Sequence, residues 1–337
     1  MSDSGPTSPV VLNRKEIEAL AGLESDAFDP DAFAAGAFDA IAEGFVRLAR
    51  GEVRQPPVLS LDLPEVAGEL DVKTAWVRGW DSFCVKLSTG FFRNPELGLP
   101  SGSGLMVVLD ATTGRPRAVL LDDGLLTDLR TAIAGGLAAR ALARPDATVA
   151  AVLGAGAQAR WQARALAAVR PLSEIRIWSR RPDAATQCAR DVERHTGVPT
   201  RSADSVAEAL RGADVVVTTT PSQEPIVPAP LLQPGMHLTS MGSDGAGKRE
   251  LEAALLRRAD LIVVDHLEQS RTIGELQGID ANTVSAPVTL GEILAGERTG
   301  RHSDDDVTVC DLTGTGVQDS AIARWLLGRY EAHGAGS

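Results

Sequence analysis

The stretch from Val149 to Ala159, Val-Ala-Ala-Val-Leu-Gly-Ala-Gly-Ala-Gln-Ala, decides the fold. Five apolar residues favour a buried strand, Gly154 and Gly156 follow directly, and an alanine-rich helical pattern comes next. In this context Gly154 permits a tight turn, and Gly156 lets the backbone approach the pyrophosphate of a dinucleotide. A chance Gly-Ala-Gly turn is the alternative, and the flanking strand and helix patterns disfavour it.

The expected helix after this turn supplies further phosphate contacts. Its first residues, Ala157 and Gln158, have backbone N–H groups without a partner inside the helix, which favours an anion at this position. Ala159 takes the place of the third glycine of the motif, where helix and strand must pack closely. The sequence therefore predicts a dinucleotide site over residues 154–159.

The end of the next expected strand bears on which dinucleotide binds. NAD enzymes usually carry Asp or Glu there for the ribose 2′-hydroxyl, whereas this chain has Trp178-Ser179-Arg180-Arg181. A serine and two guanidinium groups favour a 2′-phosphate, so we expect NADP(H) in preference to NAD(H). The alternative is that Arg180 and Arg181 are solvent-exposed loop charges.

Apolar runs alternate with helical patterns through the rest of this region. The alternation predicts an α/β fold with a Rossmann-type doubly wound parallel sheet, because parallel strands need crossover helices. Helices are expected at 157–169 and 183–195, and strands at 149–153, 174–178, 215–219, 237–241, 261–264 and 307–311.

The N-terminal part has a different pattern, with apolar residues first at helical spacing and then in short runs rich in Val, Leu and Trp. This predicts a helix at 31–50, an antiparallel sheet between 57 and 121, and helices at 125–142 and 319–333. We therefore expect a discontinuous α+β substrate and dimerisation domain at 1–130 and 315–337, and an NAD(P)-binding Rossmann domain at 131–314.

Composition disfavours several classes of partner. The chain has 337 residues, which favours two domains, and a formal charge of −12, which disfavours nucleic acid and anionic membranes. It has neither an apolar leader nor a run of about 18 apolar residues, so a cytoplasmic protein is expected. Cys84, Cys188 and Cys310 lack metal-site spacing and lie in or beside apolar stretches, which predicts buried thiols without metal or disulfide.

Several short motifs, in their order and spacing, resemble the ornithine cyclodeaminase/mu-crystallin family over residues 54–319. They are Lys86-Leu-Ser-Thr-Gly90, Asn94-Pro95 with Gly98-Leu-Pro100, Thr127-Asp-Leu-Arg-Thr-Ala132, Gly154-Ala-Gly-Ala-Gln-Ala159 and Gly242-Ser-Asp-Gly-Ala-Gly-Lys248. Other strings look most like the ectoine-utilization branch, namely Phe91-Phe92, Gly98-Leu-Pro-Ser101, Leu120-Leu-Asp-Asp123 and Met241-Gly-Ser-Asp-Gly245. The resemblance implies a homodimer formed through the sheet of the first domain, with the substrate between that domain and the Rossmann domain.

The resemblance also implies hydride transfer at the α-carbon of a small amino or imino acid, with NADP(H) or NAD(H) as cofactor. Arg54, Lys86 and Arg130 would surround the substrate carboxylate. Asp244 would be the catalytic acid/base, provided that burial raises its pKa. The residues expected to cover the cofactor are Thr219, Thr220 and Pro221, and Lys248 is expected to pair with a neighbouring carboxylate.

Each charged candidate also has a structural alternative. Lys86 lies in the apolar run 83–87, where an unpaired lysine is costly and a catalytic role would explain it, although strand alternation could turn it to solvent. Arg130 could cap a helix or form a salt bridge, and Arg54 stands in an expected loop. Asp244 could belong to an ordinary Asp-Gly turn.

One position departs from the ornithine-cyclising members of the family. Those enzymes have a glutamate in the strand before Lys86, suited to a distal amine, and Lys73 takes that place here. A lysine repels a second ammonium and attracts a second carboxylate or a carbonyl. Ornithine cyclisation is therefore disfavoured, and an acidic or acylated amino acid, or its imine, is favoured.

These observations give three hypotheses of function. The first is an NAD(P)-dependent enzyme acting at the α-carbon of an amino or imino acid, either an ectoine-degradation-type cyclodeaminase-like protein or an imine reductase. The second is a true ornithine or diamino-acid cyclodeaminase that releases ammonia. The third is a non-catalytic, NADP-binding crystallin-like protein, which the presence of Lys86, Arg130 and Asp244 disfavours.

Overall fold

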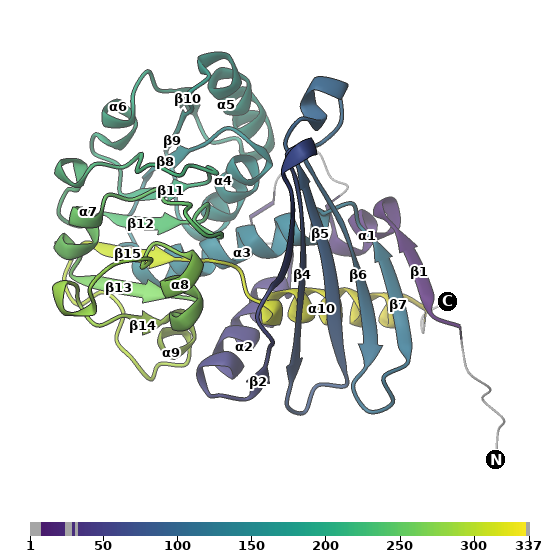
Figure 1. Cartoon of the computed structure of the whole chain (residues 1–337). Helices are drawn as coiled ribbons and strands as arrows, with labels where there is room; N and C mark the ends of the chain where they lie inside the picture. Colours follow the sequence, from purple (N-terminus) through teal and green to yellow (C-terminus); the bar gives the residue numbers. More distant parts are fainter. Residues whose placement is uncertain (1–7, 24–28, 31–32, 335–337) are drawn as a thin grey trace. The chain divides into compact units, whose positions relative to one another are not determined.

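A computed structural model describes residues 8–23, 29–30 and 33–334 (Figure 1). The chain divides into two compact units. The first contains the described residues of Met1–Glu24, Asp39–Arg130 and Thr315–Ser337, and the second those of Ser25–Phe38 and Thr131–Gly314. No helix in the described ranges is long and apolar enough to cross a membrane.

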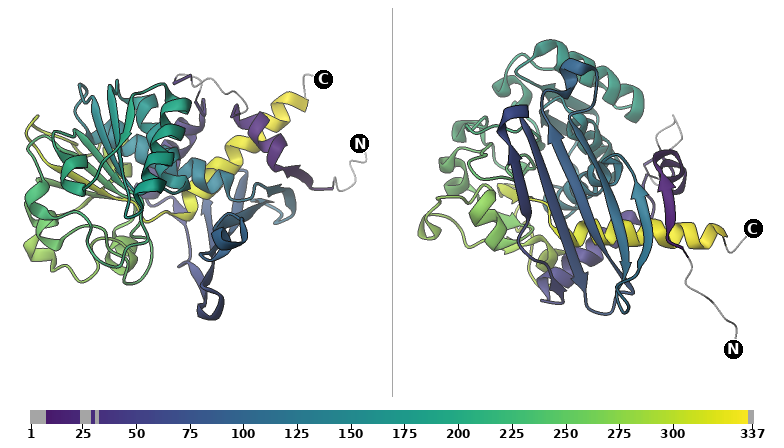
Figure 2. Two further views of the ribbon diagram at one scale, coloured as in Figure 1. Left: turned by 90° about the horizontal axis from the view of Figure 1, so that it is seen from above. Right: turned by 45° about the vertical axis from the view of Figure 1, so that its right-hand side comes forward.

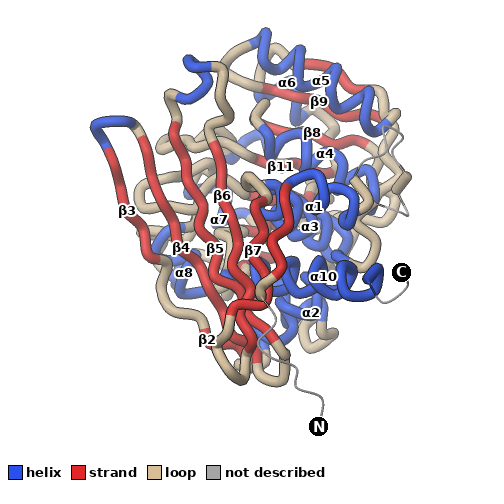
Figure 3. The backbone as a smooth tube through the Cα atoms, turned by 90° about the vertical axis from the view of Figure 1, so that its right-hand side faces the viewer, coloured by secondary structure: helices blue, strands red, loops and turns tan. Residues whose placement is uncertain are grey.

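The described part of the first unit is built on a seven-stranded sheet with the order β1-β7-β6-β5-β4-β2, in which β3 also pairs with β4. Its strands are β1 (Val10–Asn13), β2 (Val53–Arg54), β3 (Leu59–Leu63), β4 (Gly68–Val77), β5 (Ser82–Phe91), β6 (Gly102–Asp110) and β7 (Pro116–Leu121). Strands β3 to β7 pair in antiparallel fashion, as predicted between residues 57 and 121, and they lie side by side in Figure 3. Strand β2 also pairs antiparallel to β4, whereas a loop was expected at Arg54.

The C-terminal helix α10 (Gly316–Gly334) covers one face of this sheet (Figure 2). Over residues 73–77 of β4 and 82–86 of β5, which lie beneath it, every second side chain is buried, as strand alternation requires. The buried set includes Lys73 and Ala75 on β4 and Cys84 and Lys86 on β5. Two lysines therefore lie on the same buried face as apolar residues, and the sheet alone does not explain them.

The N-terminal elements differ from the prediction in two respects. The helix expected at 31–50 begins later, as α2 (Ala37–Ala49), because Ala34 and Gly36 adopt positive φ angles that end any helical turn before it; residues 31–32 lie outside the described ranges. The prediction also missed β1, which pairs in parallel with β7, and α1 (Arg14–Ala21). A capping box formed by Asn13 and Glu16 starts α1, and this pair could have revealed it.

The second unit contains an eight-stranded parallel sheet with the order β10-β9-β8-β11-β12-β15-β13-β14, which confirms the predicted doubly wound fold. Its strands are β8 (Val149–Leu153), β9 (Glu174–Trp178), β10 (Thr200–Ser202), β11 (Val215–Thr218), β12 (His237–Ser240), β13 (Leu261–Val264), β14 (Val288–Thr289) and β15 (Thr308–Asp311). Strands β10 and β14 were not predicted, since two or three residues give too short a pattern.

Helices connect these strands. They are α4 (Ala157–Val169), α5 (Pro182–Thr196), α6 (Val206–Leu210), α7 (Ala253–Arg258), α8 (Leu267–Ile273) and α9 (Leu290–Leu294). Short 3₁₀ turns occur at η1 (Pro64–Val66), η2 (Asn94–Leu97), η3 (Ala229–Leu231) and η4 (Ala281–Thr283). The boundary between the units falls inside α3 (Leu125–Leu142) and again after Gly314.

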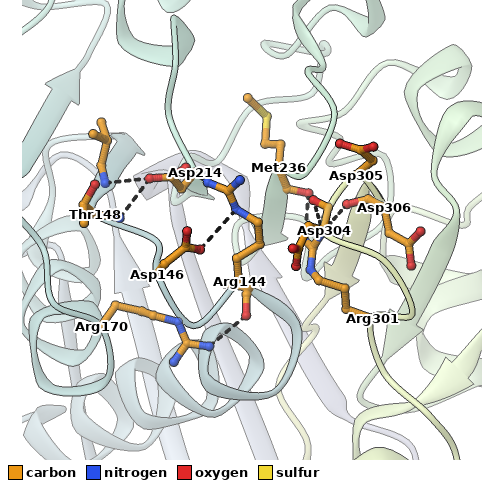
Figure 4. A network of polar contacts seen from close by, with 12 residues as sticks. Arg144, Asp146, Thr148, Arg170, Asp214, Met236, Arg301, Asp304, Asp305 and Asp306 are labelled. Carbon is orange, nitrogen blue, oxygen red and sulfur yellow. Dashed lines mark hydrogen bonds and ion pairs between the residues drawn. The ribbon is translucent and has the colours of Figure 1, made fainter.

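A polar network ties together the beginnings of the strands in the second unit (Figure 4). The Asp214 carboxylate, just before β11, accepts hydrogen bonds from the backbone N–H of Thr148 and Val149 at 2.9 and 3.0 Å, and Arg144 pairs with it at 2.5 Å. Arg301 donates to the backbone carbonyl of Asp306, before β15. These contacts are structural, because ligands of doubly wound sheets bind at the opposite, carboxyl ends of the strands.

Candidate functional site

The glycine turn after β8 has the geometry that a phosphate-binding loop requires. Gly154 has a φ of +137°, and a Cβ there would lie 2.1 Å from Thr219 Oγ1, so only glycine fits. A Cβ on Gly156 would meet no atom within 4 Å, so the space beside this backbone is open. Gly156 is the N-cap of α4 and offers no side chain to the helix N-terminus, whose N–H groups therefore suit an anion.

This turn lies at the switch point of the sheet. β8 has β9 and then β10 on one side, and β11 and then β12 on the other, so the order of the strands reverses there. Ala159, in the position of the third glycine, is fully buried. The residues present therefore fit the pyrophosphate of a nicotinamide dinucleotide, with Ala157 and Gln158 as the first residues of α4.

The residues expected at the adenosine ribose follow the end of β9. Ser179 Oγ accepts a hydrogen bond from the backbone N–H of Arg181 at 3.3 Å, and Arg180 and Arg181 are both exposed before α5 begins at Pro182. This segment therefore presents two accessible guanidinium groups and no carboxylate at its three positions. The preference for NADP(H) stays a prediction.

The segment after β11 lies against the glycine turn. Thr219 donates its backbone N–H to Leu153 O at 2.8 Å, and its side chain contacts the position where Gly154 lacks a Cβ. On the other side, a Cβ on Gly242 would lie 2.0 Å from Thr220 O. Thr219, Thr220 and Pro221 therefore stand between the segments that follow β8 and β12.

Asp244 lies on the segment after β12, but its surroundings differ from the expectation. Its side chain is 43% exposed, and its Oδ1 pairs with Lys248 Nζ at 2.8 Å. The condition of burial that was attached to the acid/base role of Asp244 is not met by this exposed side chain, whereas the pairing of Lys248 with a neighbouring carboxylate is confirmed. Its role as the acid/base stays a prediction.

Four buried carboxylates that were not predicted from the sequence lie at the same edge of this sheet: Glu250, Asp265, Glu275 and Asp311. Burial raises the pKa of all four, to about 7 for Glu275. Hydrogen bonds from hydroxyl and backbone N–H donors surround them, for example from Thr313 and Gly314 to Asp265 at 2.9 and 2.7 Å. Glu250 stands eight residues after Gly242, beyond the motif at 242–248, and no local pattern marked it.

A buried ionic cluster lies in the first unit. Lys86 Nζ is 3.4 Å from one oxygen of Asp319, and Arg130 Nε is 3.0 Å from the other. Arg130 also donates a hydrogen bond to Gln318 Oε1 at 2.9 Å. Lys86 is 2% exposed, so a solvent-facing lysine is excluded, while the salt-bridge alternative for Arg130 holds together with its place in the cluster.

Lys73 and Lys86 are register partners on β4 and β5, so they lie side by side on the buried face. Burial, opposed by Asp319 and reinforced by the charges of Arg130 and Lys73, lowers the pKa of Lys86 from 10.5 to about 7. Asp122, which also interacts with Lys86, has a pKa raised by burial to about 6. Two cations share the Asp319 carboxylate, and a third lies beside them, so the cluster suits an anionic ligand.

Arg54 does not join this cluster. It pairs across β2 and β4 with Trp76, and its guanidinium carbon lies 5.7 Å from the centre of that ring. Because Trp76 alternates with the buried Ala75, Arg54 lies on the opposite face of the sheet from Lys73 and Lys86. Asp319 and Gln318 take part instead. They lie in the first turns of α10, at the limit of the recognised motifs, and no local pattern singled them out.

The parallel sheet, its switch point and the glycine turn define the class: a dinucleotide-binding α/β enzyme with a separate cationic cluster. The chain belongs to the ornithine cyclodeaminase/mu-crystallin family, which residues 27–334 match. It is therefore an enzyme of the group of NAD(P)-dependent amino and imino acid reductases, dehydrogenases and cyclodeaminases.

Individual relatives agree with this. The chain is 47% identical to an uncharacterized cyclodeaminase of Sinorhizobium fredii, over 85% of this chain and 87% of the relative. It is 35% identical to the alanine dehydrogenase of Archaeoglobus fulgidus, over 94% and 93%. Its fold resembles the iminosuccinate reductase of Paracoccus denitrificans in complex with NAD⁺, with a TM-score of 0.83 and 30% identity over 97% of both chains.

Proposed function

We propose that the chain is an NAD(P)-dependent reductase of a small imino acid that carries a second carboxylate or carbonyl group, or the dehydrogenase of the matching amino acid. The buried pair of Lys73 and Lys86 carries this proposal. We assign substrate binding and dimerisation to residues 1–130 and 315–337, and cofactor binding to residues 131–314. When bound, the nicotinamide cofactor supplies or accepts a hydride at the α-carbon.

The charges of the first unit support the substrate class. Lys86 and Arg130 hold the α-carboxylate, because a lysine ammonium and a guanidinium both bind carboxylates through charge-assisted hydrogen bonds. Lys73, side by side with Lys86, is placed to hold a second anionic or carbonyl group. A distal ammonium would instead meet a buried cationic pair, which costs binding energy for a diamino acid. A structural neighbour, the iminosuccinate reductase, is named for an imino acid with two carboxylates, which supports this substrate class.

Asp244 has the chemistry to exchange the proton of the substrate nitrogen. Its carboxylate is accessible, and Lys248 holds it at 2.8 Å, so a substrate amine could replace that partner. NADPH is the proposed electron donor, because Arg180 and Arg181 are exposed at the position where a 2′-phosphate would lie.

A diamino-acid cyclodeaminase is the second candidate, favoured by the name of the 47% identical relative. Membership of the ectoine-utilization branch rests on the motifs at residues 91–92, 98–101, 120–123 and 241–245 alone. Ammonia release without net NAD(P)H change distinguishes a cyclodeaminase from a reductase, because a cyclodeaminase returns the hydride in each turnover.

The deciding experiment is kcat/KM over a panel of imino acids with one carboxylate, imino acids with two carboxylates, and diamino acids. The wild type should prefer two carboxylates. Lys73→Glu should reverse that ranking toward a distal amine, whereas Arg54→Gln, a change of charge on the opposite face of the sheet, should leave it unaltered. An unchanged ranking in Lys73→Glu, or wild-type preference for diamino acids with ammonia release, would contradict the proposal.

We also propose a homodimer formed through the sheet face opposite α10. That face carries half-buried apolar residues in register across β4 to β7: Val72, Val85, Leu87, Leu105, Val107 and Val119. A contiguous apolar face of this kind favours burial against a second copy. Light scattering at micromolar concentration should give the mass of two chains.

A further inference from the structure

We infer that Glu250 is a positioning residue that holds the segment after β11 and the segment after β12 in the arrangement that the reaction needs. The inference rests on the proposed function, in which residues 131–314 bind the cofactor and Asp244 exchanges a proton, and on the expectation that Thr219 and Thr220 cover the cofactor. Glu250 reaches both segments from a third part of the chain, and it is fully buried.

The two oxygens of Glu250 accept hydrogen bonds from both segments. Oε1 accepts from the backbone N–H and the hydroxyl of Thr220 at 2.6 and 2.7 Å. Oε2 accepts from the backbone N–H of Gly242 at 2.8 Å, the hydroxyl of Thr218 at 2.6 Å and the hydroxyl of Ser240 at 3.1 Å. One carboxylate thus fixes the backbone of the segment before Pro221 and of the segment that ends at Asp244.

Close backbone packing makes this arrangement sensitive to small shifts. A Cβ on Gly242 would lie 2.0 Å from Thr220 O and 2.8 Å from the carboxyl carbon of Glu250. The neighbouring Thr219 in turn contacts the place where Gly154 lacks a Cβ. A displacement of Thr220 is therefore passed on both to the glycine turn and to the segment that carries Asp244.

The backbone of Glu250 is fixed as well. Its N–H donates to Glu275 Oε1 at 2.8 Å, and its carbonyl accepts from the backbone N–H of Ile226 and Val227 at 2.8 and 3.0 Å. The backbone N–H of Glu275 donates to Asp311 Oδ2 at 2.9 Å. The carboxylate of Glu250 is therefore preorganised, which is what a residue that positions others requires.

Only a carboxylate satisfies these contacts. Four of the five groups that face Glu250 are donors to it, and the Ser240 hydroxyl, with one hydrogen, lies between Glu250 and Glu275 Oε1, the latter at 2.9 Å. An ionised carboxylate is a pure acceptor and therefore suits these donors. A glutamine of the same shape would turn its NH₂ group toward the backbone N–H of either Thr220 or Gly242, so one of these two buried donors would lose its partner. The isosteric variant Glu250→Gln therefore tests the hydrogen bonds without changing the volume of the side chain.

The experiment compares Glu250→Gln with Glu252→Gln. Glu252 undergoes the same chemical change two residues away, and its carboxylate accepts from the backbone N–H of Ala229, outside the segments in question. We expect Glu250→Gln to weaken NADPH binding and to lower kcat by about 10- to 100-fold each, the loss typical of a buried charged hydrogen bond. Glu252→Gln should keep both values within about twofold of the wild type.

Two further readouts separate positioning from other roles. The pH profile of kcat should keep its shape in Glu250→Gln, because Glu250 does not exchange the substrate proton; loss of one limb would overturn the inference in favour of an acid/base. Backbone amide exchange should accelerate at Thr220 and Gly242 in Glu250→Gln and not in Glu252→Gln. Glu250→Asp, which keeps an acceptor-only side chain, should recover part of the lost binding.

Equal NADPH affinity and kcat in Glu250→Gln and Glu252→Gln would overturn the inference. If Glu250→Gln does not fold, the variant Thr220→Val tests the inference instead, since it removes one hydroxyl donor and keeps the backbone N–H. We expect Thr220→Val to bind NADPH about 3- to 10-fold more weakly, and unchanged binding would refute the positioning role of Glu250. If the wild type binds no dinucleotide, the proposed function fails, and the amide exchange comparison, which needs no cofactor, still decides the role of Glu250.

Discussion

The buried cationic cluster predicts a pH dependence of ligand binding that can be worked out from Lys86. Its pKa is lowered by burial from 10.5 to about 7, a difference that corresponds to about 5 kcal/mol of disfavoured charge in the folded chain. Because the charged form is the disfavoured one, this residue reduces stability most below pH 7. The free energy of unfolding therefore increases as the pH rises from about 7 toward 10.5, because Lys86 loses its charge in the folded chain.

A bound carboxylate reverses this balance, because it stabilises the ammonium form and raises the pKa of Lys86. Without ligand, about half of the Lys86 side chains are charged at pH 7, and only about one in a hundred at pH 9. Binding of an anion above pH 7 must therefore take up about one proton. The dissociation constant should rise about tenfold for each pH unit between 7 and 9.

Calorimetry with a dicarboxylate that has no amine, such as succinate, measures this effect, since its carboxylates stay ionised over the whole range. Asp122 has a pKa of about 6, so it is largely ionised at pH 7 and contributes little to the change in affinity above that pH. Lys86→Arg is the matched control: arginine stays charged, so the slope should disappear. Affinity that is independent of pH between 7 and 9 in the wild type would refute the argument.

Three further predictions concern the second unit and its cofactor. Gly156→Val should abolish NAD(P)H binding in a folded protein, because the side chain would fill the open space beside the turn. Unchanged NAD(P)H affinity in calorimetry would exclude the glycine turn as the cofactor site. NADPH should bind more tightly than NADH, and tighter NADH binding by the wild type would refute this preference. Arg180→Ala should reduce the difference in binding free energy between the two cofactors by about 1.5–3 kcal/mol if the contact with the 2′-phosphate is desolvated. Asp244→Asn should lower kcat by roughly 10²–10⁴-fold, and a near-wild-type kcat would exclude proton exchange by Asp244.

The features that sequence predicted well are those set by local pattern. The strand and glycine turn at 149–156 needed only neighbouring residues, and the apolar run 83–87 identified Lys86 as a lysine on an apolar strand. The features that it missed depend on long-range contacts. Asp319 pairs with Lys86 and Arg130 only when α10 packs on the sheet of the first unit. Glu250 contacts its partners only when the segments after β11 and β12 lie together in the folded chain. Arg54 shows the reverse case, in which spacing suggested a cluster but strand alternation placed the side chain on the other face.

The covering helix α10 has a consequence for the order in which the chain folds during synthesis. Ser320, on that helix, accepts the backbone N–H of Cys84 at 3.1 Å although 236 positions separate the two residues, and it donates to Ala75 at 2.7 Å. The sheet of the first unit therefore stays uncovered until the ribosome has synthesised α10. The second unit ends at Gly314 and contains no residue of α10, so it is free to fold earlier. Late closure of a sheet by such distant contacts is intrinsically slow, so the first unit should set the folding rate and expose its strands longest to aggregation.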